Sequence, residues 1–126
     1  MVTDSDLTET ELAELEELLR ARRAADQSES ERVAESLGQV LSARSDSTAD
    51  DEHDPEGPTL SHEWSRLQGV RSETADDIKA VDAALERVAN DTYGVCVRCG
   101  RPIGVDRLRA RPTAELCIAC ARTVDG

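Results

Sequence analysis

Four cysteines stand in two identical pairs near the end of the 126-residue chain. Each pair is a C-x-x-C motif, and seventeen residues separate the two pairs. A C-x-x-C turn brings two sulfur atoms to one side of a tight loop, and two such turns supply the four thiolates that a tetrahedral Zn²⁺ prefers. The predicted ligands are Cys96, Cys99, Cys117 and Cys120. Because four thiolates leave no open position for substrate, we expect one structural zinc ion and no catalytic metal.

A redox C-x-x-C motif and a pair of disulfides are the alternatives for these cysteines. The N-terminus "MVTDSDLTETELAELEELL" is acidic and has no apolar block, which is unlike a secretory signal. No apolar stretch approaches the roughly 18 residues that span a membrane. We therefore expect a cytoplasmic chain without a membrane segment, in which cysteines are reduced thiols or metal ligands. Neither alternative explains why two pairs recur in a reducing compartment.

Three arginines alternate with smaller residues between the cysteine pairs, at positions 107, 109 and 111. They are either a phosphate-binding strip or the exposed side of a loop whose Leu108 and Ile103 pack inward. The chain has one Trp, one Tyr and no Phe, so aromatic residues that would stack on bases are scarce. The second interpretation is favoured.

Negative charge is concentrated in the first half of the chain. Residues 1–63 carry 18 Asp and Glu against 5 Lys and Arg, a balance of −13, whereas the remainder has 9 against 10, a balance of +1. An acidic surface repels a phosphate backbone and releases no counterions on contact. The charge pattern disfavours sequence-specific DNA binding and favours a protein partner with a basic surface.

A long amphipathic helix is predicted over about residues 8–43. Thr8 and Glu11 have the spacing of a capping box, in which each side chain bonds the backbone N–H of the other residue. Apolar residues then recur every three or four positions. They are Leu12, Leu15, Leu19, Val33, Leu37 and Val40.

A second helix is predicted over about residues 59–90. Pro55, Gly57 and Pro58 separate it from the first, Thr59 is its expected N-cap, and Gly94 follows as a stop signal. Its apolar stripe repeats with the same spacing. The stripe consists of Leu60, Trp64, Leu67, Thr74, Ile78, Val81, Leu85 and Val88.

The two stripes match when the second helix folds back along the first, since each is strong at both ends and weak in the middle. This pairing places Leu12 and Leu15 near Val88 and Leu85. We predict a mainly α-helical fold: a long antiparallel two-helix coiled-coil hairpin over residues 1–91, then a small four-cysteine zinc finger with a short terminal helix over residues 92–126. A compact bundle, or a partly disordered first helix, is the alternative. A hairpin that satisfies its own seam has no strong reason to dimerise, so a monomer is expected.

The turn of this hairpin, residues 44–58, is acidic. Its candidate partner-binding residues are Asp50, Asp51, Glu52, Asp54 and Glu56. A solvated loop explains the two acids just before the second helix, where the helix dipole favours them. A calcium loop fails because an aspartate stands where its invariant glycine is needed. A histidine metal site at the turn lacks a second imidazole close to His53.

Residues 92–120 resemble the DksA/TraR family of zinc-finger transcription regulators. The resemblance rests on the Tyr-Gly before the first cysteine, C-x-x-C-G, Ile103, "RLRARPTA" and the second C-x-x-C. It implies a protein that binds RNA polymerase rather than DNA, inserts its hairpin into the secondary channel and modulates initiation, in several members together with the stringent-response nucleotide ppGpp. Asp51 and Asp54 match the family's D-x-x-D tip. Glu56 stands where the family has alanine, as in the "DDEHDPEG" tip of actinobacterial members.

Two other classes of function, a protein-binding adaptor and an enzyme, are alternatives to a polymerase regulator. A zinc-stapled coiled-coil adaptor that binds a different protein is the alternative function. An enzyme is not expected, because the sequence shows no nucleophile–base pair, no phosphate loop and no open metal position.

Overall fold

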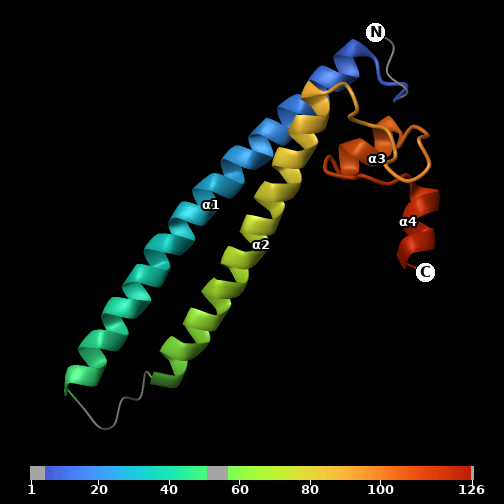
Figure 1. The fold of residues 1–126 in the computed structure, drawn as a ribbon. Helices are drawn as coiled ribbons and strands as arrows, with labels where there is room; N and C mark the ends of the chain where they lie inside the picture. The colour runs from blue at the N-terminus through green and yellow to red at the C-terminus, as the bar shows by residue number, and fades with distance from the viewer. Residues whose placement is uncertain (1–4, 51–56, 126) are drawn as a thin grey trace. The chain divides into compact units, whose positions relative to one another are not determined.

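A computed structural model of the chain describes residues 5–50 and 57–125, with side chains for residues 5–45 and 59–124. The helices are α1 (Glu9–Asp50), α2 (Gly57–Ala89), α3 (Val105–Ala110) and α4 (Ile118–Asp125) (Figure 1). Within these residues no strand forms, apart from an isolated bridge between Val95 and Pro102. The predicted fold class is confirmed: the chain is mainly helical, with two long packed helices and a four-cysteine cluster near its C-terminus.

The capping box at the start of α1 is confirmed. The backbone N–H of Glu11 donates to Oγ1 of Thr8 at 3.0 Å, and the N–H of Thr8 donates to Oε1 of Glu11 at 2.9 Å. Two N–H groups that have no partner within the helix are thereby satisfied. The acidic first turn also suits the helix dipole.

The turn between the long helices is shorter than predicted. α1 continues to Asp50 instead of ending near residue 43, because residues 44–50 contain neither proline nor glycine. α2 begins at Gly57, so Thr59 lies inside the helix and is not its N-cap. Pro58 falls in the first turn, where a missing backbone N–H costs nothing.

α2 ends at Ala89, close to the predicted position, but the residue that ends it is Asp91 and not Gly94. Asp91 adopts a left-handed conformation with φ 60°, and Gly94 lies further along the chain. The N–H groups of Thr92 and Tyr93 both donate to the carbonyl oxygen of Arg87, at 2.9 and 3.1 Å. The carbonyl of the last helical turn is satisfied by this turn, as in other left-handed helix caps.

The contacts divide the chain into two compact units, residues 25–78 and residues 1–24 with 79–126. In the first of these, α1 and α2 pack through buried Val33, Leu37, Val40 and Leu67. The partly buried residues around this cluster are Leu60, Trp64 and Val70. Charged residues pair along each helix on the outside, as Arg32 does with Glu29 at 2.5 Å.

The second unit joins the start of α1, the end of α2 and the cysteine-rich segment in one core. Leu15, Leu19 and Val81 are fully buried, and they belong to the same cluster as Leu108 of α3. The other buried members are Ala84, Tyr93, Cys96 and Ile103, and Leu12, Leu85 and Val88 pack against them, as the antiparallel register predicts. The finger, residues 92–126 of the predicted division, therefore shares its core with the helix ends.

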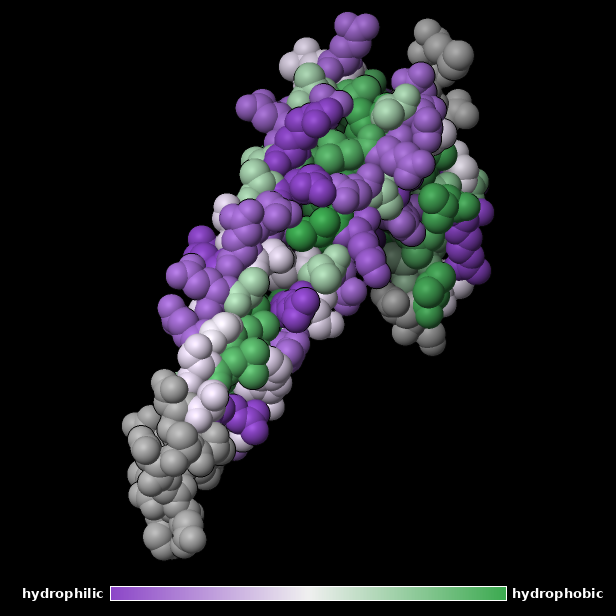
Figure 2. Space-filling model, turned by 60° about the vertical axis from the view of Figure 1, so that its left-hand side comes forward, coloured by the Kyte–Doolittle hydropathy of each residue, from purple (hydrophilic) through white to green (hydrophobic). Residues whose placement is uncertain are grey.

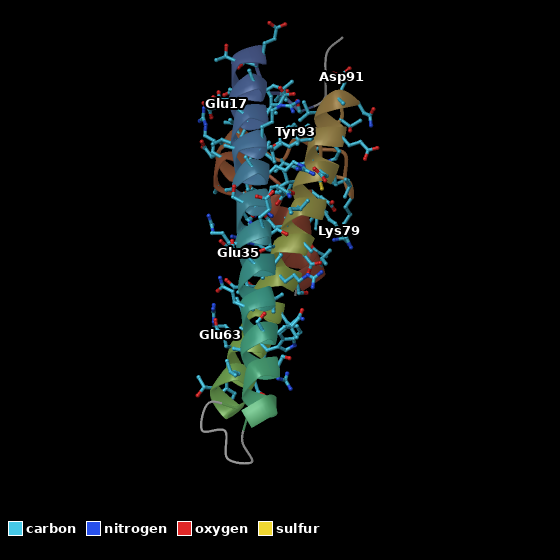
Figure 3. The ribbon with its side chains drawn as sticks, turned by 90° about the vertical axis from the view of Figure 1, so that its left-hand side faces the viewer. Glu17, Glu35, Glu63, Lys79, Asp91 and Tyr93 are labelled. Carbon is cyan, nitrogen blue, oxygen red and sulfur yellow. The ribbon has the colours of Figure 1, made fainter. Side chains whose placement is uncertain are left out.

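Acidic side chains outnumber basic ones among the exposed residues of α1. Glu17 and Glu35 are exposed and point away from the helix axis (Figure 3). In the unit that contains the finger, Figure 2 shows apolar side chains at the surface among the charged ones. The exposed large apolar residues there are Leu18, Val97, Ile118 and Val124. No helix in the described part of the chain has the length and apolar character that a membrane crossing requires.

Candidate metal centre and adjoining pocket

The first C-x-x-C turn is closed by backbone hydrogen bonds. The N–H of Gly100 donates to the carbonyl of Cys96 at 2.9 Å, and the N–H of Cys96 donates to the carbonyl of Arg101 at 2.8 Å. Gly100 has φ 75°, a left-handed conformation that glycine adopts without steric cost. The turn therefore holds Cys96 and Cys99 on one side, as the motif predicts.

The second C-x-x-C pair lies at the start of α4. The N–H of Ala121 donates to the carbonyl of Cys117 at 2.9 Å, which places Cys120 in the first turn of the helix. The N–H of Val97 donates to the carbonyl of Glu115 at 2.9 Å. This bond joins the two turns and sets their four side chains against one another.

All four predicted ligand atoms come together. The Sγ atoms of the four cysteines lie within 4.8 Å of one another, and all four are free thiols. Cys96 is buried and Cys99 is exposed, while the Sγ atoms of Cys99 and Cys117 are 3.7 Å apart. The donor set, four sulfur atoms and no oxygen, is that of a closed structural zinc site.

The protonation of the four thiols also fits a cation at their centre. Burial opposes ionisation of Cys96, but backbone N–H groups of Cys117, Cys99 and Arg98 outweigh it and lower its pKa to about 6. Burial and the three neighbouring thiols raise the pKa of Cys120 to about 12. Four negative sulfur atoms repel one another, so full deprotonation at neutral pH needs a cation such as Zn²⁺ to offset their charge.

The arginine-rich segment between the pairs is a short helix, α3, and not the predicted loop. Leu108 is fully buried and Ile103 is 7% exposed, so their predicted inward packing is confirmed. Nε of Arg109 donates to Oε2 of Glu14 in α1 at 2.8 Å. Nε of Arg107 donates to the carbonyl of Leu116 at 2.9 Å. Two of the three arginines therefore bond within the unit, which argues against a continuous phosphate-binding strip.

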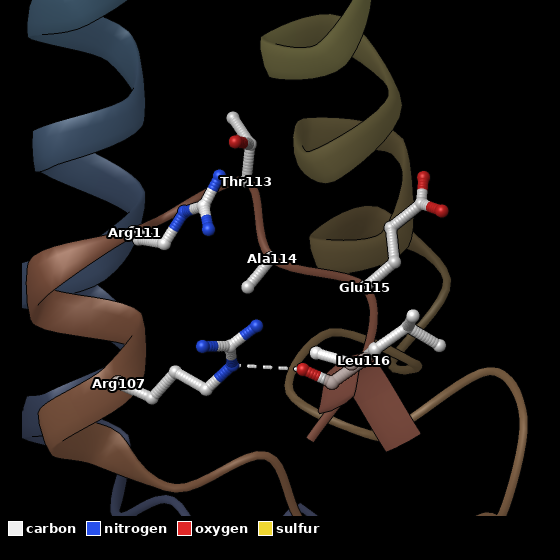
Figure 4. Close-up of a pocket in the computed structure, with 7 residues that line it drawn as sticks. Arg107, Arg111, Thr113, Ala114, Glu115 and Leu116 are labelled. Atoms are coloured by element: carbon white, nitrogen blue, oxygen red, sulfur yellow. Dashed lines mark hydrogen bonds between the residues drawn. The ribbon is translucent and has the colours of Figure 1, made fainter. Parts of the chain in front are cut away.

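A pocket of about 260 Å³ adjoins α3 (Figure 4). The guanidinium groups of Arg107 and Arg111 lie on one wall, and Ala114 lies between them in the close-up view. The lining residues are Arg107, Arg111, Thr113, Ala114, Glu115, Leu116 and Ala121. Two guanidinium groups in one concave site can bind a phosphate or a carboxylate through paired N–H donors.

Tyr93 is a buried core residue. In the sequence it stands out only as part of the Tyr-Gly pair before the first cysteine. Its hydroxyl donates to the carbonyl of Pro112 at 2.8 Å, and the residue is 2% exposed. Arg87 of α2 contacts Glu115 on the same segment, with Nη1 and Oε1 3.5 Å apart. These two contacts tie the pocket wall to the end of α2. The sequence could have predicted the burial of Tyr93, because aromatic residues are scarce in this chain and the one tyrosine before a zinc-binding turn is a natural core residue.

Replacing Tyr93 with phenylalanine should lower the free energy of unfolding by about 1–2 kcal/mol, because the carbonyl of Pro112 loses its buried donor. Burial raises the pKa of Tyr93 from 10.0 to about 12. The stabilising effect of the neutral phenol is therefore complete below pH 10 and is lost as the pH rises through about 12. Denaturant unfolding between pH 7 and pH 11 measures both effects. An alkaline decline as steep in the phenylalanine variant as in the native protein would contradict this assignment.

The predicted tip residues lie outside the residues whose placement is described. Asp51, Glu52, Asp54 and Glu56 fall in the segment 51–56, and of Asp50 only the backbone is described. Their role stays a prediction.

Comparison with known proteins identifies the finger. Residues 91–125 match the model of the prokaryotic dksA/traR C4-type zinc finger. Together with the close approach of the four cysteines, this match confirms the prediction of one structural zinc ion. Residues 91–125 therefore form a zinc finger of the DksA/TraR type.

The relatives that match more of the chain carry one name. The "RNA polymerase-binding transcription factor DksA" of Haemophilus influenzae is 31% identical over 90 residues, which are 71% of this chain and 62% of the relative. The protein of the same name from Escherichia coli K12 is 49% identical over 43 residues, 34% of this chain and 28% of the relative. The matches thus span less than two thirds of these relatives.

The fold has a counterpart among solved structures. The structure of transcription factor DksA2 from Pseudomonas aeruginosa superposes with a TM-score of 0.80 and covers 96% of this chain and 88% of that one. The sequence identity is 24%, so the likeness extends to the fold alone.

Proposed function

We propose that this protein is a transcription regulator that binds RNA polymerase, inserts the tip of its helical hairpin into the secondary channel and modulates initiation. The observation that carries the proposal is the match of the four-cysteine finger, together with part of the helical region, to relatives named as RNA polymerase-binding transcription factors. The acidic outside of α1 fits a basic protein surface better than a nucleic acid. Sequence-specific DNA contacts, an enzymatic activity and a membrane partner are not part of this function, which belongs in the cytoplasm.

The four cysteines are proposed as the complete ligand set of the zinc ion. Cys96 and Cys99 come from the first turn and Cys117 and Cys120 from the second, and their Sγ atoms share a sphere small enough for one ion. Since the same turns bury Cys96 beside Leu108, the ion stabilises the core that anchors the ends of α1 and α2.

Binding to the polymerase can be tested by co-purification. The zinc-loaded full chain should be retained by tagged core RNA polymerase as a monomer at a ratio of one to one. A second protein that occupies the secondary channel should displace it. A zinc-stapled adaptor for another protein, the alternative function, predicts no retention. Retention without displacement would place the binding site elsewhere on the enzyme and overturn the channel proposal.

The acidic tip is proposed to act on the active centre. Asp51 and Asp54 are the principal residues, with Asp50, Glu52 and Glu56 completing the negative charge. Carboxylates brought close to basic residues or to a catalytic Mg²⁺ alter the electrostatics of the site more than they add to affinity.

Changing Asp51 and Asp54 together to alanine should abolish the effect on transcription and change polymerase affinity less than about threefold, because these carboxylates are proposed to alter the electrostatics of the active centre more than they add to affinity. Initiation assays on several promoters, run beside a binding assay, separate the two quantities. The matched control is Glu73→Ala with Asp76→Ala, which removes the same charge from exposed positions of α2. Unchanged transcription by the tip variant would refute the role of the tip.

The pocket beside α3 is proposed to serve ppGpp at the polymerase interface. Arg107 and Arg111 supply two guanidinium groups at the pocket, and a nucleotide polyphosphate is a suitable anion for them. Arg111→Ala should reduce any ppGpp-dependent part of the transcription effect at least about tenfold, the loss of one charge-assisted pair. Arg122→Ala removes an exposed arginine that does not line the pocket and is the control. An equal ppGpp response in both variants would exclude this pocket.

A further inference from the structure

The residues before α1 form a strap against the segment that enters the zinc finger. Ser5 is 3% exposed, and Leu7 packs against the buried cluster that contains Leu108 and Cys96. The N–H of Leu7 donates to Oγ of Ser5 at 3.4 Å, and Asp6 between them has φ 59°. The strap, residues 5–8, turns back alongside the chain that follows α2 (Figure 1).

Gly94 shows how closely the strap lies on the finger. A Cβ atom at this position would lie 2.9 Å from Cδ1 of Leu7 and 2.9 Å from Cβ of Ser5. Gly94 also has φ 88°, which side-chain-bearing residues rarely adopt. The strap therefore packs on bare backbone two residues before Cys96, and its surface exists only while the finger holds this conformation.

A second contact joins α1 to the finger beyond the strap. Arg109 of α3 pairs with Glu14 of α1 at 2.8 Å, and its guanidinium lowers the pKa of the Glu14 carboxyl through a hydrogen bond. Both groups are nearly half exposed, so this pair orients the two helices and adds little stability. The buried contacts of Ser5 and Leu7 carry more of the attachment.

We infer that the strap couples the zinc ion to the N-terminal end of α1. The folded finger provides the surface on which Ser5 and Leu7 are buried, and zinc provides the free energy that folds the finger. Coupling of this kind is reciprocal: zinc binding closes the strap, and a closed strap raises the affinity for zinc by the same factor. Loss of the metal would then expose Ser5 and Leu7. This inference does not depend on the proposed role in transcription.

The test measures zinc affinity and backbone protection in the full chain. Leu7→Ala should weaken zinc binding about tenfold in competition with a chromophoric chelator, since it removes about half the burial of a leucine side chain. Leu18→Ala makes the same change at an exposed position of α1 and should leave the affinity unchanged. Leu7→Met keeps the apolar volume and should restore most of the affinity. Circular dichroism of the zinc-loaded variants checks that the helices are retained.

Hydrogen exchange tests the opposite direction of the coupling. Removing zinc from the native chain should speed amide exchange in residues 5–12 together with the finger, while residues 33–40, which pack in the other compact unit, keep their protection. Equal zinc affinities for Leu7→Ala and Leu18→Ala would overturn the inference. So would a strap whose exchange stays slow after the finger has opened.

Discussion

Replacing Cys117 with serine is expected to abolish stable zinc binding and to unfold the finger. Structural zinc contributes on the order of 10 kcal/mol to small domains, and three thiolates do not make a closed site. The loss should reach the helix ends, because Leu15, Leu19 and Val81 share one core with Cys96 and Leu108. Zinc content by elemental analysis and thermal unfolding by circular dichroism measure the two effects.

The matched control for this change is Val124→Ser. Val124 lies in α4, the helix that begins directly after Cys117. It is 61% exposed, so its replacement should leave both zinc content and melting temperature unchanged. Chelation of zinc from the native chain should reproduce the behaviour of the Cys117 variant. A Cys117→Ser protein with one zinc per chain and native melting would show that the four-thiolate site is wrong.

The second large effect is expected in the core beneath the finger. Leu15→Ala should lower the free energy of unfolding by about 2–5 kcal/mol, the usual cost of a cavity at a fully buried leucine. Leu15 is 0% exposed and packs in the cluster that joins α1, α2 and α3. Leu18→Ala, three residues along the same helix and 41% exposed, should change it by no more than about 0.5 kcal/mol.

Denaturant unfolding of the zinc-loaded proteins compares the pair. The two changes have the same effect on helix propensity, so their difference isolates burial. If both variants lost the same stability, the core would not have the composition described, and the register of α1 against α2 would have to be revised.

The sequence alone determined the features that depend on neighbouring residues. The capping box of Thr8 and Glu11 was recognisable because both hydrogen bonds span three residues. The C-x-x-C spacing predicted the four thiols since each turn is local. The 3-and-4 spacing within each apolar stripe, with Leu15 and Leu19 in the first helix and Val81 in the second, predicted which face of each helix is buried. These patterns repeat a short-range geometry that leaves few alternatives.

The helix ends were predicted less accurately, because several neighbouring residues can each start or stop a helix. α1 ran on to Asp50 since no residue before the tip breaks a helix, and Pro58 entered the first turn of α2 instead of preceding it. Such boundaries depend on small differences in free energy that single residues do not settle.

Only the tertiary structure decided the partners of Arg109 and Tyr93 and the burial of Ser5. Arg109 meets Glu14 across 95 residues, Tyr93 reaches Pro112 across 19, and Ser5 lies on Gly94. Exposed charges can pair with many partners at similar free energy, so no spacing in the sequence selects one. The shared core around the metal site brings these segments together, and the contacts follow from that packing.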